Sequence, residues 1–414
     1  MKKVTQSGFP FLDFKKKAST HEFPDAFSNY IRSFGEIYFW EKGNFHVITR
    51  AHHAKEVLTS DAFSADRSSF FISRMPHLDL GLIPDFFSVV KKMMVMSDDQ
   101  QHHSMRRLAS GGFEDHILEQ FSSKLENTVK GLVQSIADKD EFDFVETISK
   151  KLPSIILADL FCIPEDDRAN FLNWSMTMTG FFGGASQYRN EDGIEVNNAA
   201  LALKDYFTKL IQVRRERPDS DFVSMTLRSQ KELKLTDDEV ISQLIMMLVA
   251  GMATTTDQIN NITYLLATHP LIQQEVRDNL DLVPQMIEEC KRIDPAVTFI
   301  FRVARKDTTI GVQPIKAGEV IFISTHAINR DLPQEQLSEE INIHRRGMNF
   351  AYGHGPHYCI GAKLARMEMK ALFVELLNTI PTFTLSESHE SVRDHYSLSF
   401  SGFKNLYIKT GPMG

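Results

Sequence analysis

Apolar residues recur every three or four positions through most of the chain, from about residue 115 to residue 379. This spacing is typical of amphipathic α-helices. Prolines are expected to break the region into separate helices; they are Pro153, Pro164, Pro218, Pro270 and Pro295. Three runs rich in aromatic and branched residues, at 37–48, 309–323 and 398–408, predict short strands. The pattern therefore predicts a mainly α protein with small β-sheets.

The most informative single element is a helix that begins near Asp237. Thr236 and Glu239 have the T-x-x-E spacing of a capping box, in which each side chain accepts a hydrogen bond from the backbone of the other. No proline follows until Pro270, so the helix extends over about 32 residues, or roughly 48 Å. A helix of that length crosses a whole domain.

Small residues occupy the middle of this long helix. Met247, Ala250, Gly251 and Thr254 share one face, because positions three or four apart lie above one another. A glycine in a helix interior costs about 1 kcal/mol relative to alanine. Two interpretations follow. Either another molecule needs close access there, or the glycine serves helix packing and the threonine bonds back to a carbonyl.

Composition and charge exclude several classes of protein. The 414 residues are 42% hydrophobic, and the formal net charge of −8 argues against a nucleic-acid partner. No linker, charge block or repeat divides the chain, so we expect one domain over residues 1–414. The N-terminal residues lack the apolar region of a secretory signal, and the longest apolar run, 244–253, is half the roughly 20 residues that span a bilayer. We expect a cytoplasmic protein with no membrane span.

The cysteines direct attention to one loop. Cys162, Cys290 and Cys359 are too few and too scattered for a disulfide framework or a zinc site, and we expect Cys162 and Cys290 to be small core residues. Cys359 lies in the glycine-rich segment 350–366, FAYGHGPHYCIGAKLAR, just before an amphipathic helix. Backbone N–H groups, a helix N-terminus or a metal lower the pKa of a thiol, so Cys359 is placed to be a thiolate. A haem iron needs only one such axial ligand.

This segment resembles the haem-binding loop of the cytochrome P-450 family, whose pattern is F-x-x-G-x-x-x-C-x-G. Phe350, Gly353, Cys359 and Gly361 match it, although the stretch from Gly353 to Cys359 is two residues longer than in the pattern. The resemblance covers essentially the whole chain. It implies the cytochrome P-450 fold, in which haem b (iron protoporphyrin IX) lies between the long central helix and the helix after the cysteine. Cys359 is then the axial thiolate on the iron.

Other family elements occur in the expected chain order. Glu289 and Arg292 resemble the E-x-x-R element, which is structural in the family, and the stretch 327–331 resembles the segment before the haem loop. The resemblance further implies that Arg302 and His357 bind haem propionates.

A histidine and an arginine farther upstream extend the propionate site. The sequence SDDQQHHSMRRL resembles the family's C-helix pattern, in which a histidine and the arginine four residues later hold propionates. Aligned on the acidic start, these are His102 and Arg106, which share one helix face and can reach the same anionic edge. The neighbouring pair His103 and Arg107 is the alternative.

The resemblance also gives the long helix a role. In the family its middle reads A-G-x-(D/E)-T, where small residues make room for oxygen and the acid and alcohol deliver protons. Ala250, Gly251 and Thr254 match this pattern, but Ala253 replaces the acid. Three explanations are compatible with the missing acid. Water or a polar group of the substrate could supply the protons, or the activated oxygen could be used for a reaction with a different proton demand. Asp257, about 4.5 Å farther along the helix axis, could also serve as the acid.

The implied function is that of a haem-thiolate monooxygenase. It activates O2 with two electrons from a ferredoxin and a ferredoxin reductase, and hydroxylates or epoxidises a hydrophobic small molecule or a carrier-bound acyl or natural-product intermediate. The alternatives are dehydrogenation, oxidative coupling or peroxide-driven chemistry. We expect a monomer, with an apolar distal pocket built from 70–94, 181–182, 297–301 and 400–403. A basic face for the redox partner is expected at Arg345, Arg346, Lys363, Arg366 and Lys370.

Overall fold

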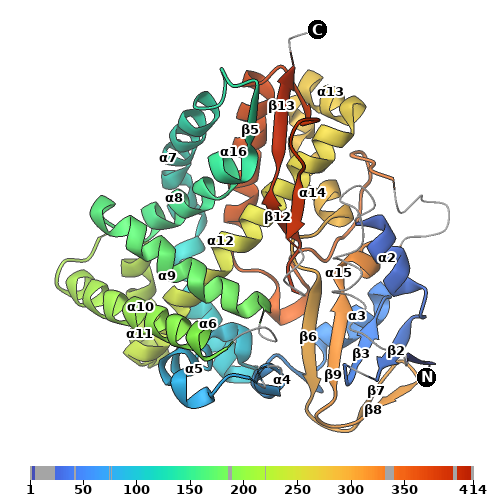
Figure 1. The fold of residues 1–414 in the computed structure, drawn as a ribbon. Coiled ribbons are helices and arrows are strands. Elements are labelled where there is room, and N and C mark those ends of the chain that lie inside the picture. The colour runs from blue at the N-terminus through green and yellow to red at the C-terminus, as the bar shows by residue number, and fades with distance from the viewer. Residues whose placement is uncertain are drawn as a thin grey trace.

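The computed structural model describes residues 2–4, 24–41, 43–73, 75, 77–184, 189–219, 221–331, 340–394 and 399–411. The described chain is mainly helical (Figure 1). Its helices are α2 (Asp25–Arg32), α3 (Ala51–Thr59), α4 (Ser68–Ser73), α5 (Pro84–Val90), α6 (Asp99–Ser110), α7 (Asp115–Gln134), α8 (Lys151–Leu160), α9 (Glu165–Gly184), α10 (Asn190–Glu216), α11 (Phe222–Leu233), α12 (Asp237–Thr268), α13 (Pro270–Asp278), α14 (Val283–Ile293), α15 (Thr325–Ile328) and α16 (Ala362–Thr379).

The largest sheet lies apart from most of the helices, at the lower right of Figure 1. Its strands, in spatial order, are β1 (Lys2–Val4), β2 (Ile37–Trp40), β3 (Phe45–Ile48), β9 (Val320–Ser324), β6 (Phe299–Ala304) and β4 (Phe63–Ser64). Three smaller sheets pair β10 (Thr382–Leu385) with β13 (Tyr407–Gly411) and β5 (Glu141–Asp143), β11 (Val392–Asp394) with β12 (Gly402–Asn405), and β7 (Thr308–Ile310) with β8 (Gln313–Ile315). The predicted mainly α fold with small sheets is confirmed.

Helix α12 runs through the middle of the molecule, as its length predicts (Figure 1). The capping box is formed: the Glu239 amide donates to Thr236 Oγ1 over 3.3 Å, and the Thr236 amide donates to Glu239 Oε2 over 2.8 Å. Among the described helices α12 alone is long and apolar enough to cross a membrane, but 67% of its most apolar window is buried inside the protein. It is therefore the central core helix.

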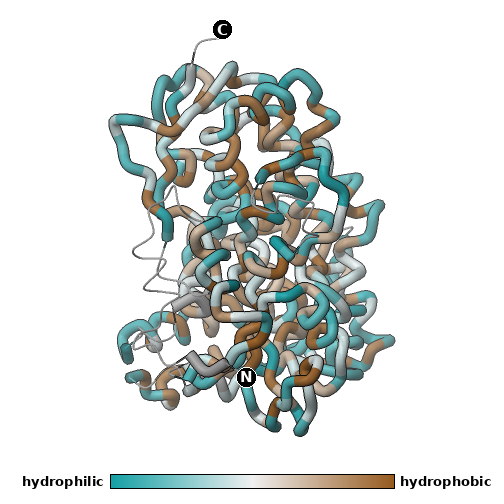
Figure 2. The backbone as a smooth tube through the Cα atoms, turned by 90° about the vertical axis from the view of Figure 1, so that its right-hand side faces the viewer, coloured by the Kyte–Doolittle hydropathy of each residue, from teal (hydrophilic) through white to brown (hydrophobic). Residues whose placement is uncertain are grey.

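The buried apolar residues form separate clusters among the helices and on the largest sheet. One large buried cluster surrounds α12 and joins α5–α11, α14 and α16, and two smaller clusters lie on the two faces of the largest sheet. In Figure 2 hydrophobic stretches run through the interior, whereas many turns at the outline are hydrophilic.

Pro153 lies at a boundary between helical segments, as predicted: a π-helical segment over Val145–Ser149 ends just before α8, and Pro153 is in the first turn of α8. One detail differs from the sequence predictions. Cys162 is exposed rather than a core residue. It follows the end of α8 with a left-handed φ of 52°, and the Ile163 amide donates back to the Ala158 carbonyl over 2.8 Å. This helix-ending turn directs the cysteine outward. Cys290 is buried, as predicted.

Candidate active site

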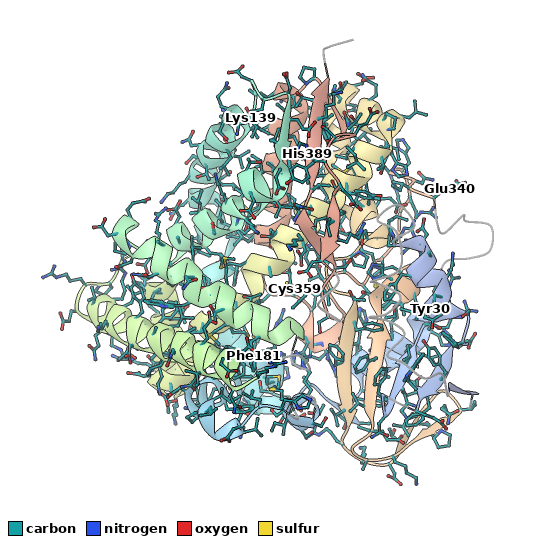
Figure 3. The ribbon with its side chains drawn as sticks, in the orientation of Figure 1. Tyr30, Lys139, Phe181, Glu340, Cys359 and His389 are labelled. Atoms are coloured by element: carbon teal, nitrogen blue, oxygen red, sulfur yellow. The ribbon has the colours of Figure 1, made fainter. Side chains whose placement is uncertain are left out.

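A cavity of about 330 Å³ lies between the middle of α12 and the loop that precedes α16. Cys359 opens into it near the centre of the molecule (Figure 3). Almost all of the predicted site residues line this one cavity: Ala250, Gly251, Thr254, His102, Arg106, Arg302, His357, Cys359 and Gly361. Segments distant in sequence therefore meet at the cavity.

The backbone of the cysteine loop is held in a conformation that requires glycine. Gly353 and Gly355 have φ values of +74° and +72°, and a Cβ on Gly355 would lie 2.7 Å from the Leu58 carbonyl oxygen. The amide of Cys359 donates to the Tyr352 carbonyl over 2.9 Å. The loop thus presents the sulfur to the cavity in a defined position.

Opposing effects act on the thiol of Cys359. Burial raises its pKa, and the backbone N–H of Gly361 and the positive charges of Arg106, Arg366 and Lys291 offset only part of this rise. A metal ion at the sulfur would complete the stabilisation of the thiolate, since a coordinated thiol is deprotonated. The site therefore fits a metal held by one sulfur.

Phe350 is the one predicted cofactor-binding residue that does not line the cavity. Its ring is buried in the cluster of apolar residues between the sheet and α3, and it does not contact the cavity. Tyr352 lines the cavity instead. With Tyr352 and Gly355 as the first two members, the F-x-x-G-x-x-x-C pattern fits with no extra residues and with tyrosine in place of phenylalanine. Aligning the pattern backwards from Cys359 would have identified Tyr352 from the sequence alone.

The small residues of α12 face the cavity, and the polar one is bonded within its helix. Thr254 Oγ1 donates to the Ala250 carbonyl over 2.7 Å. A Cβ on Gly251 would meet the side chain of Leu157 at 3.2 Å, so this glycine also serves packing. These contacts support the packing interpretation, and the same residues also line the cavity. Asp257 does not line the cavity and packs against Gly402, which leaves it poorly placed to supply protons.

One end of the cavity is rich in nitrogen donors. The rings of His102 and His357 lie 3.9 Å apart, and the buried Nε2 of His102 has no hydrogen-bond partner. Burial, followed by nearby positive charges, lowers the pKa of His102 to about 4 and that of His357 to about 2. Burial also lowers the pKa of Arg302 to about 10. An anion with several oxygen atoms would satisfy these groups, so the propionates of haem fit the site.

The structure distinguishes between the two candidate pairs on α6. His102 is buried and Arg106 lines the cavity, where its Nη1 donates to the Tyr358 carbonyl over 2.7 Å. His103 is exposed, and Arg107 forms an exposed ion pair with Glu232 at 3.3 Å. The second pair therefore faces away from the cavity.

Three charged residues of the cavity, Arg67, Lys291 and Glu368, were not foreseen from the sequence. Arg67 enters at the end rich in nitrogen donors, from the segment between β4 and α4, and lies 5.9 Å from the ring of Phe301. Lys291 and Glu368 reach the cavity from α14 and α16. Burial raises the pKa of Glu368 to about 8, and its Oε2 has no hydrogen-bond partner. No local motif marks Arg67 or Glu368, and Lys291 occupies a variable position of the E-x-x-R element.

Glu289 and Arg292 have the structural role that their spacing implies. Arg292 donates to both carboxylate oxygens of Glu289, at 2.8 and 2.9 Å, and both side chains are buried. Arg345 joins this pair at 3.3 Å from Glu289 and is nearly buried. It is therefore not part of an open basic face. Lys363 pairs with Asp115, and Arg366 binds Glu288 at 2.8 Å, while Arg346 and Lys370 are exposed.

The apolar part of the cavity matches the predicted lining only in part. Met94, Val297 and Ile300 line it, and the other apolar lining residues include Val95, Phe113, Leu157, Met246 and Met247. Phe181 packs against Phe86, with ring centroids 4.9 Å apart, and Phe403 packs against Tyr264 at 5.1 Å. These two rings belong to the core. The side chains of Phe70 and Phe182 lie outside the described residues.

A sulfur that lines an internal cavity beside a cluster of cations, opposite a long helix with small residues, defines a haem-thiolate protein. The family model of cytochrome P450 matches residues 7–403. The chain belongs to the cytochrome P450 family, and its relatives are monooxygenases with a haem-thiolate cofactor.

Similar proteins come from bacteria. The biotin biosynthesis cytochrome P450 of Bacillus subtilis (strain 168) is 31% identical over 287 residues, which cover 68% of this chain and 71% of that protein. The mycinamicin IV hydroxylase/epoxidase of Micromonospora griseorubida is 31% identical over 294 residues, with 70% and 72% covered.

Solved structures agree with the fold. P450BioI in complex with hexadec-9Z-enoic acid ligated acyl carrier protein superposes with a TM-score of 0.85 at 26% identity, covering 96% of this chain and 100% of that chain. CYP109E1 from Bacillus megaterium, in complex with testosterone, has a TM-score of 0.81 at 26% identity, with 94% and 99% covered.

Proposed function

We propose that this cytochrome P450 hydroxylates or epoxidises a hydrophobic small molecule, or an acyl or natural-product intermediate attached to a carrier protein. The observation that carries the proposal is the apolar cavity beneath Ala250 and Gly251, which opens directly onto Cys359. An apolar wall with few polar groups suits an apolar ligand. The solved complexes of P450BioI with an acyl carrier protein and of CYP109E1 with testosterone support both kinds of substrate.

The cofactor that we propose is haem b, with Cys359 as the axial thiolate. Bound there, it supplies activation of O2 with two electrons from a redox partner. His102, Arg106, Arg302 and His357 are proposed to bind the propionates through charge-assisted hydrogen bonds. Gly361 donates its amide to the sulfur, which favours the thiolate.

Thr254 is the proposed proton carrier of this site. Its hydroxyl donates to the Ala250 carbonyl, so the oxygen can accept a hydrogen bond from water in the cavity and pass on a proton by rotation. Ala253 provides no carboxylate to resupply this proton. Cavity water, or a polar group of the substrate, takes that role in our proposal.

Electrons are proposed to come from a separate ferredoxin and ferredoxin reductase. The exposed Arg346 and Lys370 remain candidates for the docking face of an acidic partner. We also propose a monomeric, single-domain, cytoplasmic protein with no nucleic-acid partner.

A ligand screen tests the substrate class. Free fatty acids, acyl carrier proteins loaded with the same acids, steroids and macrolides, and sugars and amino acids as hydrophilic ligands, would be titrated into the ferric protein while the spin-state shift of the Soret band is recorded. Saturable shifts by apolar ligands are expected. A response limited to hydrophilic ligands would contradict the proposal.

Ala253 favours a second candidate function, in which the activated oxygen leads to dehydrogenation or oxidative coupling, or hydrogen peroxide replaces O2. Turnover with hydrogen peroxide alone is to be compared with turnover with ferredoxin and reductase. Products of the ferredoxin system are to be analysed for 18O from 18O2. Incorporation of one labelled oxygen with the ferredoxin system supports monooxygenation. Product without labelled oxygen supports the second candidate.

A further inference from the structure

A buried lysine lies on the cysteine side of the cavity. The side chain of Lys291 is only 1% exposed, and its Nζ donates to Glu288 Oε1 over 2.7 Å. The ammonium also lies 3.9 Å from the centre of the Tyr352 ring. Arg366 approaches the same ring at 4.6 Å and the same carboxylate oxygen at 2.8 Å. Two cations therefore share one aromatic ring and one carboxylate.

The charges of this cluster do not cancel. Lys291 and Arg366 contribute two positive charges and Glu288 one negative charge, while Asn349 Nδ2 donates to the other oxygen of Glu288 over 3.1 Å. Burial lowers the pKa of Lys291 to about 8, which leaves the ammonium charged at neutral pH. One positive charge thus remains. Arg366 and Glu288 are partly exposed, whereas the Lys291 ammonium is buried, where charges interact more strongly than in water.

The cluster is linked to Cys359 through Tyr352, whose ring contacts both cations. The Tyr352 carbonyl accepts the amide of Cys359 at 2.9 Å, and Lys291, Tyr352 and Cys359 line the same cavity. The positive charges of Lys291 and Arg366 favour the thiolate form of Cys359, and the thiolate in turn favours the charged form of Lys291. The surplus positive charge and the thiolate are therefore matched.

We propose that Lys291 is a positioning residue that acts electrostatically on Cys359: its buried ammonium stabilises the thiolate and makes the bound iron easier to reduce. The step concerned is the transfer of one electron from the redox partner, which converts ferric to ferrous iron without a proton. A nearby positive charge stabilises the form with the added electron. This inference rests on the proposed haem-thiolate role of Cys359.

Replacement variants separate this role from a purely structural one. Lys291→Met keeps the length of the side chain and removes its charge, whereas Lys291→Arg keeps the charge. Lys363→Met is the matched control, because Lys363 lies at the start of α16 on the same side of the protein but is exposed and paired with Asp115. Lys291→Gln serves as a second neutral variant if the methionine variant does not fold.

The measurement is a potentiometric titration of each haem-loaded protein. In Lys291→Met the ratio of reduced to oxidised protein at a fixed potential is expected to fall about tenfold, which corresponds to about 59 mV for one electron. Lys291→Arg and Lys363→Met are expected to stay close to the wild type. A neutral variant with normal folding and an unchanged midpoint would overturn the inference.

A spectrum of the reduced carbon monoxide complex keeps the two proposals apart. Absence of the red-shifted Soret band in folded wild-type protein would contradict the thiolate role of Cys359 itself. A normal wild-type band together with an unchanged midpoint in both neutral variants would contradict only the role of Lys291.

Discussion

The imidazole rings of His102 and His357 lie against each other, 3.9 Å between centroids and tilted by 40°. One ring comes from α6 and the other from the loop before Cys359, so the contact joins two segments that are far apart in the chain. Two neutral histidines beside Arg106 and Arg302 leave donors available for an anion. The proposed binding of the haem propionates depends on this arrangement.

Loss of one nitrogen donor should weaken retention of haem. His357→Ala is expected to release haem about tenfold to a hundredfold faster, because a hydrogen bond to a charged group contributes about 1.5–3 kcal/mol. The rate is to be measured by transfer of haem to apomyoglobin. His103→Ala is the control, since His103 is exposed and does not line the cavity. Equal rates for the two variants would contradict the assignment.

A side chain on Gly355 should destabilise the cysteine loop. Gly355→Ala places a Cβ 2.7 Å from the Leu58 carbonyl at a φ of +72°, and about 1–3 kcal/mol of unfolding free energy should be lost. Urea unfolding gives this value. Gly361→Ala is the matched control, because its φ is −81° and its Cβ would meet no atom within 4 Å. A larger loss in the control would count against the argument.

Removal of the hydroxyl of Thr254 should uncouple the reaction. Thr254→Ala is expected to lower product formed per reductant consumed by about tenfold or more, with a matching rise in hydrogen peroxide. Both quantities can be measured in one assay. Thr256→Ala is the control, because Thr256 donates to the Ser149 carbonyl over 3.0 Å and does not line the cavity. Unchanged coupling in Thr254→Ala would contradict the proton relay.

Glu368 should make stability depend on pH. Burial raises its pKa from 4.5 to about 8, so the folded protein binds the proton more tightly than the unfolded chain. Its stabilising contribution is complete below pH 4.5 and is lost as pH rises towards about 8, by at most about 1.4 kcal/mol per pH unit. Glu368→Gln should remove this slope.

Urea unfolding between pH 5 and 8 measures the slope. Glu375→Gln is the control on the same helix, because Glu375 is only half-buried and accepts a hydrogen bond from Thr379 at 3.3 Å. Identical slopes in wild type and Glu368→Gln would show that the carboxyl group is not protonated in the folded protein.

The sequence by itself determined those features that depend on neighbours in the chain. The extent of α12 follows from the capping box of Thr236 and Glu239 and from Pro270, and the pairing of Glu289 with Arg292 follows from their spacing on one helix turn. The cysteine loop was recognisable because glycines and one thiol are local signals. These features reflect backbone hydrogen bonding and helix periodicity, which act over a few residues.

Only the tertiary structure decided which helix faces point inward. Periodicity places His102 with Arg106 and His103 with Arg107, but the packing of α6 against α11 and α12 brings only the first pair to the cavity. The same holds for Lys291, whose partner Tyr352 comes from another segment. These contacts depend on the burial of side chains and on the attraction of charged groups between segments that are distant in the chain. A local sequence pattern therefore does not predict them.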